Sequence, residues 1–267
     1  GGTTFSQLAS TNNGTFYYCQ KIAVTDNGTV LVATRDGGIQ RSTDGGASFT
    51  KVLGFGASAS TDRAADIEIA ANDDIYVTMG IFDTDGIYKS TDDGASWTKL
   101  TGGGIATGRR IEIACAPSNE DRLIALFHST ANSDVSDIQR SDDGGTTWTN
   151  LTVPGAFGMT NFTRGQAWYD LIAAFDPNDD ATIWIGGIDV LRSTDSGASW
   201  SQQTQWYGGG GYPYMHADQH AMVYHEGSST RLFFGNDGGI YRTDNANAGG
   251  GASIVEIYND YNVTQFY

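Results

Sequence analysis

The sequence lacks the features of a membrane-spanning or a helical protein. No run of 18 apolar residues occurs, which excludes a transmembrane helix. No segment repeats its apolar residues every 3.6 positions, so very little helix is expected. Proline is scarce, at 4 of 267 residues, whereas glycine is abundant, at 36. Glycine at this level, in a chain rich in Thr, Val, Ile and Tyr, predicts many tight turns between short strands.

Basic residues are scarce as well. The chain has 15 Lys and Arg against 31 Asp and Glu, and its formal net charge is −16. Such a surface repels phosphate backbones and anionic lipid, so neither nucleic acid nor membrane insertion is expected. High negative charge suits a secreted or cell-surface protein, and we expect an extracellular location. The two cysteines, Cys19 and Cys115, are expected to be buried free thiols.

A nine-residue motif occurs four times. Its copies are Arg41–Phe49 (RSTDGGASF), Lys89–Trp97 (KSTDDGASW), Arg140–Trp148 (RSDDGGTTW) and Arg192–Trp200 (RSTDSGASW). The serines that open the copies are 48, 51 and 52 residues apart, and a decayed fifth copy follows at Thr243. A period near 50 residues with strand-rich content predicts a β-propeller or a similar array.

Each repeat contains four short strand-like segments separated by polar turns. In the second repeat they are AADIEIAA, IYVTM, DGIYKS and WTKL. Four antiparallel strands per repeat form the blade of a propeller. We therefore predict an all-β fold of about five four-stranded antiparallel blades, with residues 1–267 forming a single domain.

The two ends of the sequence leave two alternatives open. TTFSQL near the N-terminus resembles a fourth strand without its motif, and NVTQFY at the C-terminus resembles the beginning of a first strand. In one alternative, these segments share a blade and close a small ring. In the other, which we favour, the chain is part of a larger propeller and would expose sheet edges if left uncovered.

The repeated motif has the chemistry of a hairpin between the third and fourth strands. Its aspartate can accept backbone N–H bonds, and its hydroxyls can close the loop. The second glycine supplies a positive φ, and the aromatic residue can wedge between neighbouring sheets. The glycines are Gly46, Gly94, Gly145 and Gly197, and the aromatic residues are Phe49, Trp97, Trp148 and Trp200. This is a complete structural account, and it requires no ligand.

The pattern Ser-x-Asp-x-Gly-x-Ser/Thr-Trp/Phe resembles the Asp-box, or bacterial neuraminidase repeat. The runs GTVLVATRDGGIQRSTDGGASF and FFGNDGGIYRT look most like the sortilin-like and xyloglucanase-like branch of these propellers. The resemblance implies that the boxes lie at the blade periphery, away from the active face. Sialidase activity is not expected, since that family's Arg-Ile-Pro motif is absent.

Two aromatic loops are candidate binding surfaces. The first, Gln205–Met215, places Trp206, Tyr207, Tyr212 and Tyr214 around four glycines. The second, Gly155–Tyr169, contributes Arg164 and Trp168 and is expected on the same face. Exposed aromatic rings on loops suit sugar stacking or a protein-binding hot spot. The alternative is ordinary packing of long loops between blades.

Three aspartates are weak candidates for catalysis. Asp66, Asp170 and Asp218 lie near the expected first strands, which line the central channel of a propeller. A glycosidase needs two carboxyl groups, about 5–5.5 Å apart for retention or about 6.5–9.5 Å apart for inversion. In xyloglucanases of this type the two aspartates come from two facing propellers, and neither maps onto a motif here. The alternative for each is a solvated or ion-paired channel residue.

The segment HADQH is a weak metal candidate. His216, Asp218 and His220 are two positions apart, so in a strand all three would face one way and could ligate zinc. We favour the alternative, a hydrogen-bonded channel wall. The turn Asn236–Gly239 is a weak calcium candidate without the EF-hand pattern. No cofactor is otherwise expected.

These observations favour an extracellular, non-catalytic propeller that binds protein or glycan through its loop face. The alternative is a xyloglucanase-like glycoside hydrolase module, or half of one, acting on a polysaccharide. The sequence does not decide whether the protein is an enzyme. The expected partners are a protein, a polysaccharide or other domains of the same parent protein.

Overall fold

Burial follows position within each repeat. The second segment of a repeat, such as IYVTM, is mostly apolar, and in the structure it is buried throughout and lies in the middle of a sheet. The fourth segment is short and polar, and it lies at the outer edge of the sheet. A continuous, mostly apolar run therefore marks a central strand, and a short polar segment marks an outer one.

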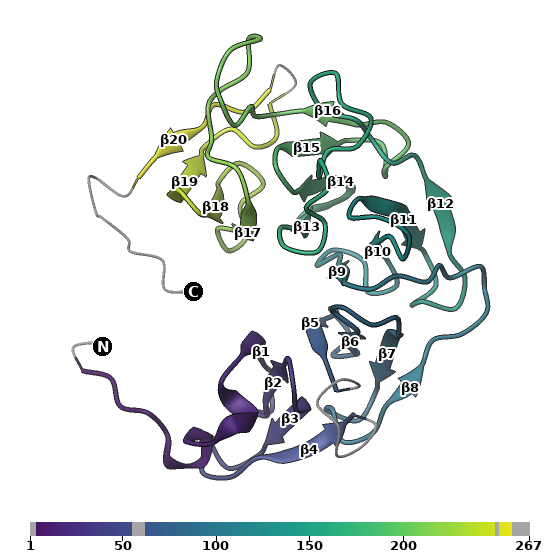
Figure 1. Ribbon diagram of the computed structural model, residues 1–267, viewed down its shortest axis with the longest axis vertical. Helices are drawn as coiled ribbons and strands as arrows, with labels where there is room; N and C mark the ends of the chain where they lie inside the picture. The colour runs from purple at the N-terminus through teal and green to yellow at the C-terminus, as the bar shows by residue number, and fades with distance from the viewer. Residues whose placement is uncertain (1–3, 55–61, 249–250, 258–267) are drawn as a thin grey trace.

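The computed structural model describes residues 4–54, 62–248 and 251–257, which form five four-stranded antiparallel sheets (Figure 1). The first sheet contains β1 (Cys19–Val24), β2 (Val30–Thr34), β3 (Gly38–Ser42) and β4 (Thr50–Leu53). The second contains β5 (Ala64–Ile69), β6 (Ile75–Met79), β7 (Gly86–Ser90) and β8 (Thr98–Lys99). The third contains β9 (Ile111–Cys115), β10 (Leu123–His128), β11 (Val135–Ser141) and β12 (Thr149–Leu151). The fourth contains β13 (Ile172–Asp176), β14 (Asp179–Gly186), β15 (Val190–Ser193) and β16 (Ser201–Gln202). The fifth contains β17 (Gln219–Tyr224), β18 (Leu232–Asn236), β19 (Gly239–Thr243) and β20 (Val255–Glu256).

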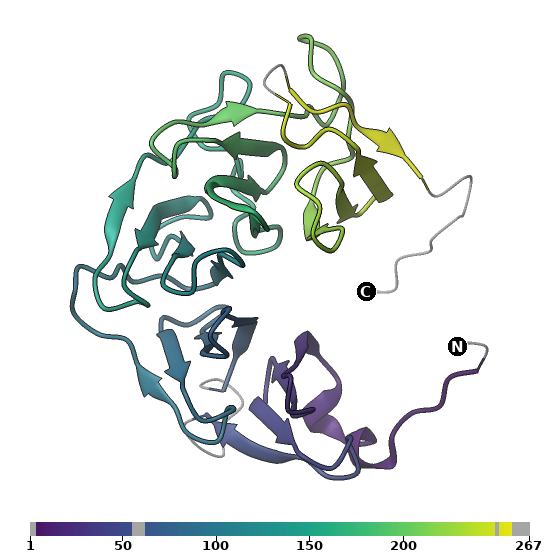
Figure 2. The ribbon, with the colours of Figure 1, turned by 180° about the vertical axis from the view of Figure 1, so that it is seen from behind.

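The sheets are the blades of a β-propeller, as the sequence predicts. The first strand of every blade is innermost, and each inner strand contacts the inner strand of the next blade, from β1 to β17. The outermost strands follow the periphery, which is clear from both sides in Figures 1 and 2. The described residues contain only two short 3-10 turns, η1 (Ala9–Thr11) and η2 (Gly14–Phe16), and no helix among them is long and apolar enough to span a membrane.

An open sector separates β1 of the first blade from β17 of the fifth blade (Figures 1 and 2). Residues 4–8 form no strand, although the sequence of this region resembles a fourth strand. The C-terminal NVTQFY segment lies outside the described residues. Each described sheet takes all four strands from consecutive sequence, so no described blade is shared between the two ends of the chain.

The apolar core is divided into four clusters, one between each pair of neighbouring blades. Between the fourth and fifth blades, for example, the Trp184 and Phe234 ring centroids lie 5.9 Å apart. Both cysteines are free thiols. Cys115 is buried as expected, but the expectation is wrong for Cys19, which is exposed because β1 borders the open sector.

The repeated motif forms the predicted hairpin between the third and fourth strands. In the first blade, the Asp44 carboxylate accepts hydrogen bonds from the Ser48 backbone N–H (2.9 Å) and the Ser48 hydroxyl (2.6 Å). The Ser42 hydroxyl donates to Asp44 (2.8 Å) and accepts from the Gly46 N–H (2.9 Å), where φ is +86°. These hydrogen bonds from the two serines lower the pKa of Asp44 to about 2. The loop is therefore closed by its own side chains.

The decayed fifth copy keeps this arrangement with an amide in place of the carboxylate. Asn245 Oδ1 accepts from the Thr243 hydroxyl (2.8 Å) and from the Ser253 N–H (2.7 Å). Ser253 lies eight positions after Asn245 instead of four. The fold therefore tolerates both an insertion and a neutral acceptor at this turn.

Replacing Asp44 with alanine is expected to lower the melting temperature by about 2–4 °C, because it removes the acceptor for Ser48 and Ser42. Asp44→Asn should lose less, since Asn245 fills the same role in the fifth blade. Differential scanning calorimetry of both variants provides the measurement. An unchanged melting temperature in Asp44→Ala would contradict the structural role of the hairpin.

Candidate functional site

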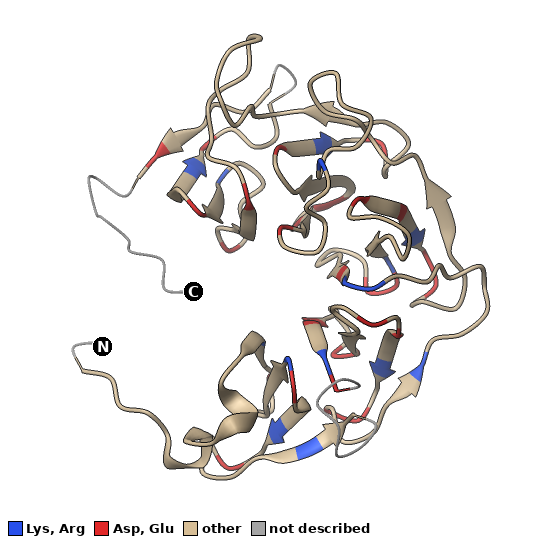
Figure 3. Ribbon diagram, viewed as in Figure 1, with Lys and Arg blue, Asp and Glu red and all other residues tan. Residues whose placement is uncertain are grey.

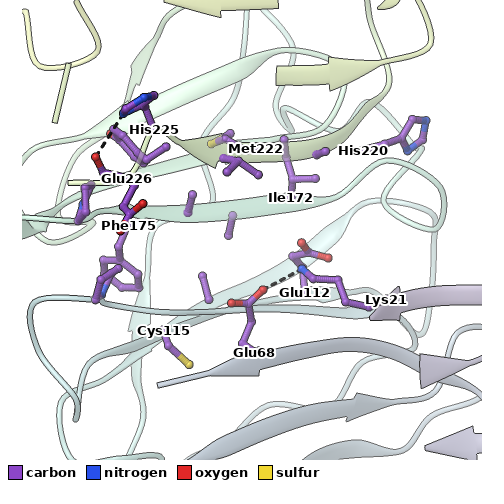
Figure 4. A pocket seen from close by; sticks show the side chains of 18 of the residues that line it. Lys21, Glu68, Glu112, Cys115, Ile172, Phe175, His220, Met222, His225 and Glu226 are labelled. Atoms are coloured by element: carbon purple, nitrogen blue, oxygen red, sulfur yellow. Dashed lines mark hydrogen bonds and ion pairs between the residues drawn. The ribbon is translucent and has the colours of Figure 1, made fainter. Parts of the chain in front are cut away.

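Two of the cavities formed by the described residues include candidate residues from the sequence or charged groups from several blades. The first, the central cavity, is lined mainly by inner strands and has a volume of about 520 Å³ (Figure 4). Lys21 of β1, Glu68 of β5 and Glu112 of β9 form one wall, and Ile172 of β13 and Met222 of β17 belong to the facing side. Charged groups therefore converge at the centre from three different blades. Figure 3 shows that other acidic residues are spread over the turns of all the blades.

The charged wall is an ion-paired network built around Lys21. The Lys21 ammonium lies 2.8 Å from the Glu68 carboxylate and 3.1 Å from the Asp66 carboxylate. Asp66 is buried, and its carboxylate also accepts from the backbone N–H groups of Ile67 (2.9 Å) and Ile113 (3.1 Å). The carboxylate of Asp66 is thus occupied by structural partners and is not among the groups that line the cavity.

Burial sets the protonation of the network. Desolvation raises the pKa of Glu112 to about 8, and the charge of Asp66 adds to this, whereas Arg110 and Lys21 oppose it. Desolvation likewise raises the pKa of Glu68 to about 7. Burial lowers the pKa of Lys21, but the three surrounding carboxylates outweigh it and hold that pKa above its usual value. Near neutral pH, this wall can therefore exchange protons with a ligand or with solvent.

The second cavity, the loop-face cavity, lies between the fourth and fifth blades and has a volume of about 310 Å³. Long loops that precede β13 and β17 and the turn between β14 and β15 supply its walls. The lining residues are Arg164, Gln166, Ile188, Trp206, His216, Ala217 and Asp218. Four of them were candidates from the sequence, which had assigned Arg164 and Trp206 to ligand binding, Asp218 to catalysis and metal binding, and His216 to metal binding.

One buried aspartate holds the two most prominent lining residues together. The Asp189 side chain is fully buried and accepts a hydrogen bond from the Arg164 guanidinium (2.7 Å). Its other oxygen accepts from the Trp206 backbone N–H (2.9 Å). Burial raises the pKa of Asp189, and the charge of Arg164 opposes this shift. Sequence reasoning missed Asp189, because a single aspartate in the GGIDV turn resembles any other turn former.

The two other candidate aspartates lie close to each other but differ in access. Asp218 lines the cavity, whereas Asp170 is fully buried behind it. Burial, followed by the charge of nearby Asp218, raises the pKa of Asp170 to about 9, so Asp170 is protonated at neutral pH. Of the three predicted carboxylates, only Asp218 can therefore meet a ligand in this cavity.

Backbone conformation is unusual at the same place. Arg164 and Asp218 both have positive φ, at 49° and 64°, although neither is glycine. Non-glycine residues in this region carry strain, and such strain is concentrated at binding and catalytic sites. Two of the lining residues are thus held in conformations that the surrounding loops impose on them.

The residues of the HADQH segment do not face one way, and this part of the sequence prediction is wrong. β17 begins only at Gln219, so His216 and Asp218 precede the strand and do not follow its alternation. His220 instead lies 2.8 Å from the Asp237 carboxylate and packs against the Tyr169 ring, with centroids 4.7 Å apart. The described residues contain no group of three or more His, Cys, Asp or Glu side chains that could hold a metal ion.

The calcium candidate turn at Asn236–Gly239 is closed by its own groups. The Asn236 side chain accepts a hydrogen bond from the Gly238 N–H (3.0 Å). The Asp237 carboxylate interacts with His220 and accepts from the Tyr169 hydroxyl (3.1 Å). The side-chain oxygens of Asn236 and Asp237 are therefore engaged with protein partners.

The two aromatic loops lie side by side, next to the loop-face cavity. Gln202, just before the first loop, accepts a hydrogen bond from the Phe157 N–H in the second (2.9 Å). The Tyr207 ring packs edge-on against Phe157 and Trp206, at centroid distances of 5.4 Å and 5.0 Å. All three rings are partly exposed, as are Trp168, Tyr212 and Tyr214. The structure thus places an aromatic surface beside a polar cavity.

Comparisons with known proteins agree with the fold. No protein-family profile matches the chain, and no curated protein matches it. A GH74 xyloglucanase from Xanthomonas campestris has a similar structure, with 16% identity over 85% of this chain and 36% of that one and a TM-score of 0.61. YCF48 from Cyanidioschyzon merolae is similar at 12% identity over 89% of this chain and 71% of that one, with a TM-score of 0.57.

A gluconolactonase from Xanthomonas campestris is also similar, at 13% identity over 84% of this chain and 71% of that one, with a TM-score of 0.56. At these identities the likeness shows the propeller fold alone. The chain spans about a third of the length of the GH74 enzymes that it resembles. The activities of these proteins are their own, and they differ from one another.

Proposed function

We propose that this protein binds a neutral polysaccharide at the loop-face cavity and the adjoining aromatic surface. The observation that carries the proposal is the convergence of Trp206, Arg164, Gln166 and Asp218 on one cavity of about 310 Å³. Pockets for small ligands start at about this size and combine apolar walls with a few placed polar groups. An indole face can stack on a sugar ring while amide and charged groups bind its hydroxyls.

The charge of the chain favours a neutral glycan over an acidic one. A net charge of −16 repels uronate or sulfate groups at long range. The cation in the cavity, Arg164, is already paired with buried Asp189, so it has little charge to offer an anionic sugar. We place the protein outside the cell and assign its hairpins to the Asp-box class, with a structural role in each blade.

The second candidate function is hydrolysis of the bound glycan. The observation in its favour is that Asp218 lines the cavity with protonated Asp170 nearby, in a fold similar to that of GH74 enzymes. Against it, Asp170 is fully buried and does not reach the cavity. We therefore favour binding without turnover.

Binding is tested by isothermal titration calorimetry with xyloglucan, mixed-linkage glucan and mannan. Trp206→Ala is expected to weaken the affinity for the bound glycan about tenfold, because loss of one stacking contact removes about 1.4 kcal/mol. Gln166→Ala should weaken it by a similar factor. Tyr17→Ala, which removes an exposed aromatic side chain outside these loops, should bind as the parent chain does.

Two outcomes would overturn the proposal. Affinity unchanged in both Trp206→Ala and Gln166→Ala would remove this cavity from the binding site. Release of reducing sugar that is abolished by Asp218→Asn would establish hydrolysis in place of simple binding.

A further inference from the structure

The sheet face of the fifth blade that borders the open sector is largely apolar, and none of the described residues covers it. Phe233 of β18 holds the same position in the fifth blade as Trp184 of β14 holds in the fourth. Phe233 pairs with Val223 of the first strand and Arg242 of the third, and Trp184 pairs with Ala174 and Arg192 in the same way. By the same register, Ile240 is the counterpart of Val190.

Equivalent positions differ sharply in exposure. Val190 is 0% exposed because the fifth blade covers it, whereas Ile240 is 50% exposed and Val223 is 62% exposed. Val255, on the edge strand of the same face, is also exposed. The fifth blade therefore presents the kind of apolar face that the fourth blade buries against its neighbour.

A hydrogen bond that recurs between neighbouring blades is also missing at the two blades that border the open sector. The arginine one position before the end of the third strand donates to a carbonyl in the hairpin of the next blade: Arg41 to Asp93 (2.8 Å) and Arg140 to Ser196 (2.7 Å). Arg192 donates in the same way to Ala246. Between the second and third blades, where lysine replaces this arginine, the Tyr76 hydroxyl donates to the equivalent carbonyl, that of Gly144 (3.0 Å). Each acceptor directly follows the hairpin aspartate, or the asparagine that replaces it in the fifth blade.

The fifth blade has the arginine of this contact and the first blade has the acceptor carbonyl, but neither has its usual neighbouring blade among the described residues. Arg242 holds the equivalent position in the third strand of the fifth blade, but it pairs with Asp244 of its own hairpin (2.8 Å). At the other side of the sector, Gly45 occupies the acceptor position of the first hairpin. No cation in the described part of the chain donates to its carbonyl oxygen.

Leu8 lies where a leucine at the end of the preceding blade's outer strand lies in two other blades, although residues 4–8 form no strand here. In the third and fourth blades, the second hairpin glycine packs against a leucine at the end of the preceding blade's outer strand or directly after it: Gly145 against Leu100 and Gly197 against Leu151. Gly46 of the first blade packs against Leu8 in the same way. In the second blade, Gly94 packs against Leu31 of β2 instead. Phe5–Leu8 also has the aromatic-x-x-Leu pattern of Trp97–Leu100.

We propose that the open sector is filled by further blades of this same repeat, and that Phe5–Leu8 is the outer strand of the last of them. The blade next to the fifth one would cover Val223 and Ile240 and supply a hairpin carbonyl to Arg242. The blade next to the first one would supply the cation for Gly45. Because Phe5–Leu8 would be a strand of one of these blades, we assign them to the same polypeptide.

A second copy of the chain does not fit this sector. The sector between β1 and β17 is narrower than the arc that the five blades occupy in Figure 1, so another five-bladed arc is too large to complete the ring. Closure by further blades also has a consequence for the central cavity. Lys21 and Met222 line it from the two blades that border the sector, so closure would complete its wall.

The test determines the full natural polypeptide to which this 267-residue chain belongs and compares the two by hydrogen–deuterium exchange. A natural polypeptide with no residues beyond these 267 would overturn the proposal. Peptides covering β17–β19 and β1 are expected to exchange at least tenfold more slowly in the longer protein, and peptides of β9–β11 should exchange equally in both. Equal exchange of β17–β19 in the two proteins would overturn the proposal.

A second measurement uses the chain alone. Its apolar faces should bind the dye 8-anilinonaphthalene-1-sulfonate, and the double variant Val223→Asp/Ile240→Asp should lower the fluorescence at least twofold. Met159→Asp, at an exposed apolar residue of the aromatic loops, is the matched control and should change it little. A discrete dimer in light scattering that Val223→Asp dissociates would assign the face to a second copy and overturn the proposal.

Discussion

Replacing Trp184 with alanine is expected to lower the free energy of unfolding by about 3–5 kcal/mol, the largest effect of any substitution considered for this chain. Trp184 is fully buried between the fourth and fifth blades, where it packs with Phe234 and lies beneath the Arg192 guanidinium, 5.6 Å from the ring. Removing the indole leaves a cavity that rigid neighbouring sheets cannot fill. At roughly 2–4 °C per kcal/mol, the melting temperature should fall by about 10 °C.

The effect should extend to ligand binding, because the loop-face cavity lies between the same two blades. Urea denaturation measures the stability of Trp184→Ala, and glycan titration at a temperature where it stays folded measures its affinity. Trp168→Ala provides the matched control, since that indole is partly exposed and should change stability by less than about 1 kcal/mol. A Trp184→Ala protein as stable as the parent chain would show that the blades do not rely on this cluster.

Local chemistry made the fold predictable. The 48–52-residue period, the glycine and aspartate of each hairpin and the apolar second segments all act within one repeat. The structure follows them closely, down to the acceptor role of Asn245 in the decayed copy. Strand order also follows, because consecutive antiparallel strands joined by short turns have few other ways to pair.

The candidate site was only partly predictable, because its geometry depends on contacts between distant segments. Arg164, Asp189 and Trp206 lie on three different loops, and no spacing in the sequence links them. The sequence named Arg164 and Trp206 from composition alone and passed over Asp189, which orients both. The aspartates Asp170 and Asp218 were named together, but nothing in the sequence showed that Asp170 would be fully buried and that Asp218 would line the cavity.

The error in the HADQH segment has a physical cause. Alternation along a strand would have aligned His216, Asp218 and His220, but the strand begins after Asp218, whose φ is +64°. A single residue in the left-handed backbone region turns the chain, so the side chains before it and after it do not lie on one face. Aspartate tolerates this conformation better than most residues, which is a signal that period-two reasoning does not use.

The pH dependence of stability should show two opposing contributions. The hairpin carboxylates Asp44 and Asp92 have pKa values lowered to about 2 by bonds to their own serines. Their contribution is complete above a pH of about 4 and is lost as the pH falls through the folded value. Glu112 acts in the opposite sense, because burial raises its pKa to about 8 in the folded state. Stability should therefore be greatest at mildly acidic pH.

Replacing Glu112 with glutamine is expected to remove the second contribution. Between about pH 4.5 and 8 the folded chain binds a proton at Glu112 that the unfolded chain has released, so stability falls as the pH rises through this range. The side chain of Glu112 is only 12% exposed, against 28% for Glu68, so the shift at Glu112 should dominate. Glu112→Gln should be more stable than the parent chain by about 1–3 kcal/mol at pH 8, since one pKa unit corresponds to about 1.4 kcal/mol and part of the shift is screened.

The two proteins should converge at pH 4, where Glu112 is protonated in both the folded and the unfolded chain. Urea denaturation from pH 4 to pH 9 measures the difference, and Glu226→Gln, at an exposed position of the same cavity, is the control and should follow the parent chain. A stability difference between Glu112→Gln and the parent chain that stays constant over this range would show that Glu112 is charged in the folded protein. In that case Lys21 and Arg110 would hold a fixed carboxylate, and the central wall would carry its full negative charge at neutral pH.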